Sequence, residues 1–181
     1  TYTIIGALLG KDLKISGIIE EHIDALLSKL KEMGVPLEVN DNSLTISKPD
    51  SFKPINVKTL VFPGFPTDLQ QPLTTLLTQA KGKSIVEETL YENRFKNTHD
   101  LNRMGAITNI LTLNKLEIKG PKKLKGTNVI ATDLRGGASL LIAGLIAEGQ
   151  TVIDNCDVIL RGYGNLVNKL TNIGAKIEIT E

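Results

Sequence analysis

The chain lacks tryptophan and has little of the other aromatic residues, of cysteine and of net charge. Its 181 residues include four Phe, three Tyr and one Cys, with 21 basic against 20 acidic side chains. A formal charge of +1 provides no general field for a nucleic acid or an acidic membrane, and so few aromatic rings argue against base-stacking platforms. Recognition of any anion must therefore be local, and the core must be aliphatic.

Cysteine pairs, metal motifs and long apolar runs are also missing. The single cysteine, Cys156, cannot form an intrachain disulfide, and no Cys/His spacing resembles a metal site, so neither a metal nor a cofactor is expected. The longest strongly apolar run, 140–147, is far shorter than the roughly 20 residues that a membrane-spanning helix needs. The N-terminus has no basic leader and begins in mid-pattern, as a cut fragment would. We expect a domain from a reducing cytoplasm.

The apolar pattern alternates along the chain between helical and strand spacing. In residues 1–50 it predicts a helix, a strand, an amphipathic helix and two short strands. Residues 51–120 and 121–181 repeat this order with a leading strand in front. The pattern therefore predicts a single domain, 1–181, that is built from three βαβαββ units, the first and last of them incomplete.

The boundaries of the expected elements follow from the same periodicity. The predicted helices are 2–9, 20–33, 68–80, 97–104, 134–148 and 164–173. The predicted strands are 13–19, 36–39, 43–47, 55–61, 84–88, a hairpin over 106–118, and 128–132, 151–155 and 176–179.

Two stretches of the chain read as copies of one another, each with a Thr-Asp-Leu helix start and an arginine one strand and one loop later. Asp68 and Arg94 in the first copy correspond to Asp133 and Arg161 in the second. A further arginine, Arg135, lies two residues after Asp133. The duplication thus presents carboxylates and guanidinium groups at equivalent loop ends, a layout typical of a site for an anionic ligand.

The arginines favour a small, multiply charged anion. A lone arginine is usually solvated or ion-paired, but planar guanidinium groups bind phosphate and carboxylate through two parallel hydrogen bonds, which lysine cannot do. Three guanidinium groups at corresponding loop ends therefore indicate that they bind one anion together.

Two positions have alternative interpretations. Asp68 follows a threonine at a helix start, so its carboxylate could cap the helix or accept a proton from a substrate hydroxyl. The Gly136-Gly137 pair could leave helix-start amides open to a phosphate or could allow close packing of the helix, and we favour packing.

Four motifs carry a family resemblance: FPGFPTDLQQP (62–72), ETLYENRF (88–95), ATDLRGGASLLIAGLIAEG (131–149) and RGYGNLVNKLTNIGA (161–175). They closely resemble the C-terminal half of the UDP-N-acetylglucosamine enolpyruvyl transferases, the 1-carboxyvinyltransferases of bacterial peptidoglycan synthesis. The resemblance extends over the whole chain, and the FPTDLQ and ENRF motifs distinguish it from the related enzymes of the shikimate pathway.

The resemblance implies an α/β (α+β) fold, an inverted α/β barrel of three βαβαββ units with helices inside and sheets outside. It also implies a two-domain cytoplasmic enzyme that moves the enolpyruvyl group of phosphoenolpyruvate to the 3'-hydroxyl of UDP-N-acetylglucosamine and releases phosphate, in the first committed step of peptidoglycan synthesis. In the family an N-terminal catalytic domain supplies the acid loop and a lysine that binds phosphoenolpyruvate. The chain alone is therefore expected to be inactive, with no nucleic-acid or membrane partner.

Individual positions take their expected roles from the resemblance. It implies that Asp68 is the base that takes the hydroxyl proton and that Arg161 is a second catalytic residue. The implied substrate contacts are Thr67, Asp68 and Leu90 for the UDP-sugar, Arg135 and Arg161 for phosphoenolpyruvate, and Arg94 for the closed cleft.

The chain also departs from the family pattern. Leu160 stands where an acidic residue is expected before Arg161, and Cys156 does not match the family's reactive cysteine. A different class of function stays open beside the transferase, namely a non-catalytic module that binds an anion or a nucleotide sugar on the same scaffold.

Overall fold

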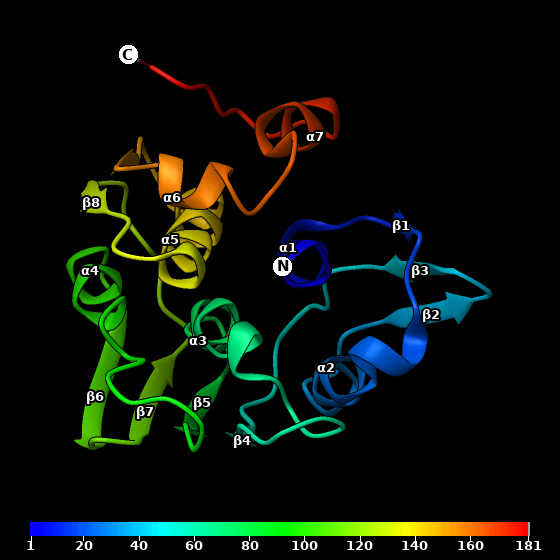
Figure 1. Ribbon diagram of the computed structural model, residues 1–181, viewed down its shortest axis with the longest axis horizontal. Helices are drawn as coiled ribbons and strands as arrows, with labels where there is room; N and C mark the ends of the chain where they lie inside the picture. The colour runs from blue at the N-terminus through cyan, green and yellow to red at the C-terminus, as the bar shows by residue number, and fades with distance from the viewer. Residues whose placement is uncertain (181) are drawn as a thin grey trace.

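Three helices form the centre of the computed structural model, which describes residues 1–180, and three small sheets surround them (Figure 1). The central helices are α1 (Tyr2–Leu9), α3 (Gln70–Leu77) and α5 (Leu134–Ile146), and they pack on one another. Every residue of α3 is buried. Because a helix covered on all sides must lie inside a domain, the predicted architecture with helices inside and sheets outside is confirmed.

The first sheet is antiparallel, with the strand order β1-β3-β2. Its strands are β1 (Leu13–Ser16), β2 (Leu37–Asn40) and β3 (Ser43–Ile46). The amphipathic helix α2 (Glu20–Glu32) buries Leu26, Leu27 and Leu30 beneath it. These elements confirm the pattern predicted for residues 1–50.

The second sheet has four strands in the order β4-β5-β7-β6. These are β4 (Asn56–Lys58), β5 (Gly82–Glu87), β6 (Ile107–Thr112) and β7 (Lys115–Gly120), with α4 (Thr98–Arg103) before the hairpin. Strands β4 and β5 are parallel, and α3 forms the crossover between them. Since parallel strands end at the same edge of a sheet, the loops after β4 and β5 lie side by side, and Thr59 N donates to Glu87 O over 2.9 Å.

The third sheet repeats this βαβ arrangement with two strands. β8 (Asn128–Ile130) and β9 (Val152–Asp154) are parallel, and α5 is the crossover between them. Two short helices follow, α6 (Asp157–Leu160) and α7 (Leu166–Asn172). In both units the crossover helix begins directly after the loop that leaves the first strand, so α3 and α5 start at equivalent places.

The C-terminal part of the chain corrects two predictions. Residues 176–179 form no strand within the part of the chain that the structure describes, because the segment after α7 pairs with neither strand of the β8-β9 sheet. Apolar alternation alone does not make a strand when no sheet edge is beside it. The predicted helix over 164–173 is shorter, because Asn165 has a left-handed backbone (φ 58°) and the helix begins after it.

The core is aliphatic, as the composition predicts. Leucine, isoleucine, valine, alanine and methionine make up nearly all of it, and the buried aromatic residues are Phe52, Phe65 and Phe95. No helix within residues 1–180 is long and apolar enough to cross a bilayer.

Candidate functional site

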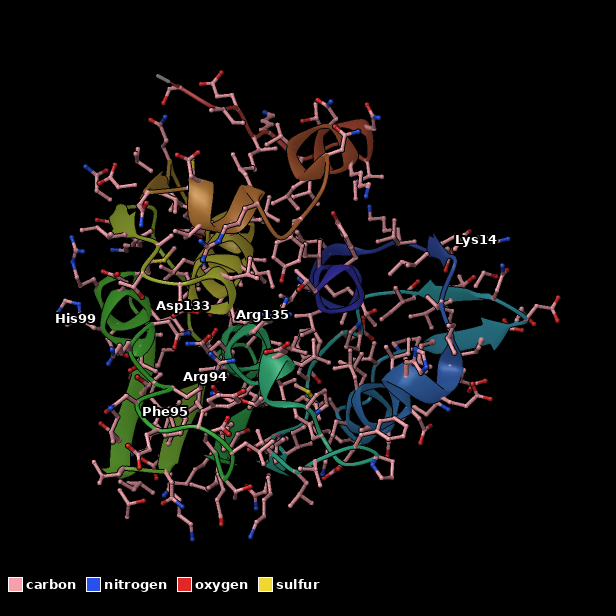
Figure 2. The ribbon with its side chains drawn as sticks, viewed as in Figure 1. Lys14, Arg94, Phe95, His99, Asp133 and Arg135 are labelled. Atoms are coloured by element: carbon pink, nitrogen blue, oxygen red, sulfur yellow. The ribbon has the colours of Figure 1, made fainter. Side chains whose placement is uncertain are left out.

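Asp68 lies between two arginines that come from different parts of the chain. Its Oδ1 accepts from Arg94 Nη2 over 3.1 Å and its Oδ2 accepts from Arg135 Nη2 over 2.7 Å. Figure 2 shows Arg94 and Arg135 close to each other near the start of α3. The carboxylate side chain is 53% exposed while the two arginines are 20% and 29% exposed, so this cluster is open to a ligand on the carboxylate side. The one carboxylate and the two guanidinium groups give this cluster a net charge of +1.

The local fold frees the Asp68 carboxylate from helix capping. Pro66 is extended (φ −75°, ψ 139°) and begins the 3-10 turn η1 (Thr67–Leu69), which leads directly into α3. Neither η1 nor α3 has a side-chain capping bond. The capping interpretation of Asp68 is therefore wrong, and both carboxylate oxygens bond to the arginines.

Asp133, the equivalent residue of the second copy, does cap its helix. It is extended (φ −154°, ψ 169°), and its Oδ1 accepts from Arg135 N over 3.0 Å and from Gly136 N over 2.9 Å. The next amide, Gly137 N, donates to Asp133 O over 2.8 Å. These bonds occupy the amides of residues 135–137 in the first turn of α5, so those amides are not open to a phosphate.

The packing interpretation of the glycine pair is confirmed. A Cβ atom at Gly137 would lie 2.5 Å from Ile159 Cγ1, on α6. One at Gly136 would lie 2.9 Å from Asp133 Oδ2. The glycines thus let α6 and the capping carboxylate approach the start of α5 and, through it, fix the backbone of Arg135.

The Arg135 side chain is held at both of its terminal nitrogens. Beside the Asp68 bond, its Nη1 donates to Tyr163 Oη over 3.1 Å, and Tyr163 Oη shares a hydrogen bond of 2.8 Å with Thr1 Oγ1. Partial burial opposes the charge, but the bonds to Asp68 and Tyr163 outweigh it and raise the pKa of Arg135. Arg135 is therefore a fixed, permanent cation.

Two neighbours orient the guanidinium of Arg94, in addition to Asp68, and a third holds its backbone carbonyl. Its Nε donates to Thr67 Oγ1 over 3.4 Å, and its Cζ lies 5.0 Å from the centre of the Tyr91 ring, within reach of a cation–π interaction. Gln71 Nε2, from the buried helix α3, donates to Arg94 O over 3.0 Å. Asn93 has a left-handed backbone (φ 54°), which turns the loop before the arginine.

Glu88 is a site residue that the sequence did not predict. It is 2% exposed, and its Oε1 accepts from Thr59 Oγ1 (2.8 Å), Leu90 N (2.9 Å) and Tyr91 N (3.2 Å). Its Oε2 accepts from Thr67 Oγ1 over 2.8 Å. In the sequence Glu88 is one of two adjacent glutamates at a strand end, a pattern that does not distinguish a buried carboxylate from a solvated one.

The structure brings most of the predicted site residues together, but not all of them. Thr67, Asp68, Arg94 and Arg135 form one connected set, and Glu88 links Leu90 to it. Leu90 itself is 39% exposed.

Arg161 stands apart from this set. It is exposed at the end of α6, and its side chain has no hydrogen bond or ion pair to another of the residues 1–180. Leu160, half-buried beside it, offers no carboxylate that would hold the guanidinium.

Metal ligands do not gather in the described part of the chain. Across residues 1–180, no group of three or more His, Cys, Asp or Glu side chains is placed to hold a metal ion.

The fold and the site together define an enolpyruvyl transferase domain. The structure of the enolpyruvyl transferase NikO from Streptomyces tendae is similar to 98% of this chain, with a TM-score of 0.87 at 30% identity, and the match covers 42% of that protein. EPSP synthase from Acinetobacter baumannii shares the fold over 90% of this chain, with a TM-score of 0.64 at 20% identity, over 40% of that protein.

The family model for EPSP synthase (3-phosphoshikimate 1-carboxyvinyltransferase) matches residues 1–170, and the chain belongs to this family. Within it, the chain is 45% identical over 177 residues to UDP-N-acetylglucosamine 1-carboxyvinyltransferase 2 of Listeria monocytogenes. It is 46% identical over 182 residues to UDP-N-acetylglucosamine 1-carboxyvinyltransferase 1 of Streptococcus agalactiae. These relatives confirm the resemblance read from the motifs.

The matches cover nearly all of this chain but less than half of each relative. They span 98% of the chain and 42% of the Listeria protein, and 100% of the chain and 43% of the Streptococcus protein. The chain therefore corresponds to one part of these longer proteins.

Proposed function

We propose that this chain is the C-terminal half of a UDP-N-acetylglucosamine 1-carboxyvinyltransferase and contributes one wall of its active site. The observation that carries the proposal is the Asp68 carboxylate, which takes no part in helix capping and lies between two arginines. The Asp68 carboxylate caps no helix and can therefore accept a proton from a hydroxyl. The two arginines beside it leave the cluster with a net positive charge, which favours an anionic second substrate.

In the proposed reaction Asp68 takes the proton of the 3'-hydroxyl of UDP-N-acetylglucosamine. The oxygen then adds to C2 of phosphoenolpyruvate while C3 gains a proton, and loss of phosphate from C2 with a proton from C3 leaves an enolpyruvyl ether. Thr67 and Leu90 lie on the loops after β4 and β5 and are joined through Glu88, so both would line the sugar nucleotide site.

The arginines bind the anion. Arg135, fixed by Tyr163 and by the start of α5, has a planar fork suited to the carboxylate or phosphate of phosphoenolpyruvate. Arg94 reaches the same cluster from the other side. Both arginines hold Asp68, so an anion that binds them exchanges with Asp68 and leaves the carboxylate for the sugar hydroxyl. The Arg161 side chain has no hydrogen bond or ion pair to other residues within 1–180, so it is available to the same anion once the active site is assembled.

The proposal places the remaining chemistry outside this chain. The family resemblance assigns the proton-donating loop and a lysine for phosphoenolpyruvate to an N-terminal domain, which is thus the required partner. Aligned catalytic groups can account for several powers of ten in rate, so the chain alone should be inactive. A cytoplasmic location and a place in the first committed step of peptidoglycan synthesis belong to the same proposal.

Phosphate release from phosphoenolpyruvate and UDP-N-acetylglucosamine tests the function. We expect turnover by the complete protein, little by residues 1–181 alone, and a large loss on Arg135→Lys in the complete protein. Arg103→Lys, in an exposed pair with Asp100 on α4, is the matched control and should keep full activity. Substantial turnover by the chain alone would contradict the half-site proposal.

Calorimetric titration of the chain with each substrate separates the transferase from a non-catalytic binding module. A half site predicts weak binding, because only part of the contacts to each ligand are present. Tight binding without a partner domain would favour the module instead.

A further inference from the structure

Glu88 is buried and has no charged partner among residues 1–180. Of the acidic residues in the described chain, Glu88 and Glu117 are the buried ones, at 2% and 7% exposure. Glu117 pairs with Lys83 and Lys119, whereas the hydrogen-bond donors to Glu88 are two hydroxyl groups and two backbone amides. Removing a carboxylate from water is unfavourable unless several well-placed donors compensate for the lost hydration. The four donors around Glu88 provide this compensation, so their arrangement depends on a carboxylate at this position.

The donors to Glu88 come from three segments that surround the site. Thr59 follows β4, Thr67 begins η1, and Leu90 and Tyr91 lie in the loop after β5. One side chain therefore fixes both site loops relative to each other. The backbone bond between these loops lies close to the strands, where Thr59 N donates to Glu87 O. Farther along, side chains tie the two loops together, including the bonds from Arg94 to Thr67 and Asp68.

Two of these four bonds lead on to Arg94. The Thr67 hydroxyl gives its proton to Glu88 Oε2 over 2.8 Å, which leaves its lone pairs for Arg94 Nε at 3.4 Å. The amide of Tyr91 donates to Glu88 Oε1 over 3.2 Å, and the ring of Tyr91 lies 5.0 Å from Arg94 Cζ. Two of the groups that orient the guanidinium of Arg94, beside Asp68, are thus held by the same carboxylate.

We propose that Glu88 is a positioning residue, which acts through Thr67 and Tyr91 to hold the Arg94 guanidinium where it meets the anionic ligand. The identity of that ligand rests on the function proposed above. The placement of Arg94 by Glu88 does not, so the two can be tested separately.

Glu88→Gln is the informative variant because it keeps the size of the side chain and changes one oxygen into an NH₂ group. That group can only donate, so at the place of Oε2 it donates to the Thr67 hydroxyl and competes with Arg94 Nε for its lone pairs, and the Thr67 proton loses its acceptor. Glu87→Gln is the matched control. Glu87 is the neighbouring residue, and its carboxylate pairs with Lys58 and Lys115 on the other face of the strand.

Nitrogen-15 NMR of the full-length protein, labelled at arginine, reports on Arg94 without any need for activity. The Nε–H resonance of Arg94 is assigned by its disappearance in Arg94→Lys. We expect Glu88→Gln to move this resonance to the position of exposed arginines and Glu87→Gln to leave it in place. An unchanged Arg94 resonance in folded Glu88→Gln protein overturns the proposal. Should that variant fail to fold, Thr67→Val serves instead, because it breaks the same link and leaves Glu88 three donors; an unchanged resonance overturns the proposal there too.

Kinetics of the complete transferase then test the consequence. We expect Glu88→Gln to raise the KM for phosphoenolpyruvate roughly tenfold, the scale of one charge-assisted hydrogen bond. The double variant Glu88→Gln/Arg94→Lys should be no worse than Arg94→Lys alone, within about twofold, since Glu88 acts through Arg94. If the KM effects of the two single variants multiplied in the double variant, Glu88 would not act through Arg94. A lowered Tm of Glu88→Gln with unchanged KM would show that Glu88 is purely structural. Either result would contradict the proposal. A wild-type protein without phosphate release refutes the proposed function, while the NMR result still decides the role of Glu88.

Discussion

Arg135 Nη2 donates to Asp68 Oδ2 over 2.7 Å, although 67 residues separate them in the chain. The pair joins the start of α5 to the start of α3, and it exists because both helices are crossovers in equivalent βαβ units that pack side by side. Each unit directs its helix start toward the same place, so one unit supplies the carboxylate and the other the cation. The candidate site is therefore a product of the repeat and not of either copy alone.

Asp68→Asn in the complete protein should lower kcat by a factor of about 10² to 10⁴, the range attributed to a general base. Stability should change little, because the carboxylate is half exposed and caps no helix, and exposed ion pairs contribute at most about 1 kcal/mol. Phosphate release and urea denaturation measure the two effects. Asp100→Asn, in an ion pair on α4, is the control and should leave kcat unchanged. Wild-type turnover by Asp68→Asn would remove the base from the proposal.

The two aspartates also show what the sequence could not resolve. Asp68 and Asp133 occupy the same place in a repeated Thr-Asp-Leu motif, yet only Asp133 has the extended backbone that directs its carboxylate to the helix amides. The proline before Thr67 and the 3-10 turn after it give Asp68 a different direction. The second copy has Ala131 in place of the proline, but the Thr-Asp-Leu motif itself does not show how the two backbones differ.

Asp133→Ala should destabilise the protein by about 1 kcal/mol, because the amides of Arg135 and Gly136 lose their acceptor. Asp133→Asn should keep most of this stability, since asparagine is an equally good N-cap. Chemical denaturation of both variants checks the difference. Equal losses in the two would mean that the charge of Asp133, and not its capping oxygen, stabilises α5.

Gly137→Ala should destabilise the protein by about 1 to 3 kcal/mol through overpacking. The new methyl would lie 2.5 Å from Ile159 Cγ1, and this clash outweighs the gain of up to about 1 kcal/mol that alanine offers inside a helix. Gly164→Ala is the control, because a Cβ there has no neighbour within 4 Å. Thermal unfolding of both variants tests the packing, and a stabilised Gly137→Ala protein would contradict it.

The periodicity of the chain predicted most elements and the aliphatic core, because both depend on local apolar spacing. It failed at 176–179, where a strand needs a sheet edge that only tertiary structure can provide. It also missed Glu88, whose burial depends on donors from Thr59 and Thr67, about 20 to 30 residues away in the chain. Those contacts exist only because β4 and β5 are parallel and end together. The roles implied for Arg94 and Arg161 by the resemblance remain predictions.

Glu117 should make the stability of the protein depend on acid pH. Its carboxylate, on the central strand β7, accepts hydrogen bonds from Lys83, Lys119 and Asn109, and these lower its pKa from 4.5 to about 2. A carboxylate with a lowered pKa stabilises the folded state fully above the unfolded value near 4.5, and this contribution is lost as the pH falls toward 2. Glu117→Gln should therefore unfold at lower urea concentration than wild type at pH 7, and the two midpoints should converge between pH 4.5 and about 2.

Urea titrations of both proteins at several pH values measure the convergence. Glu148→Gln is the control: its pair with Lys123 is largely exposed, so its midpoint should follow that of wild type at every pH. A constant gap between wild type and Glu117→Gln down to pH 2 would mean that the lysines do not favour the charged form of Glu117. The packing of the glutamine side chain between Lys83 and Lys119 would then explain the loss, and the outer face of the β5-β7 pair would owe its stability to side-chain contact instead of charge.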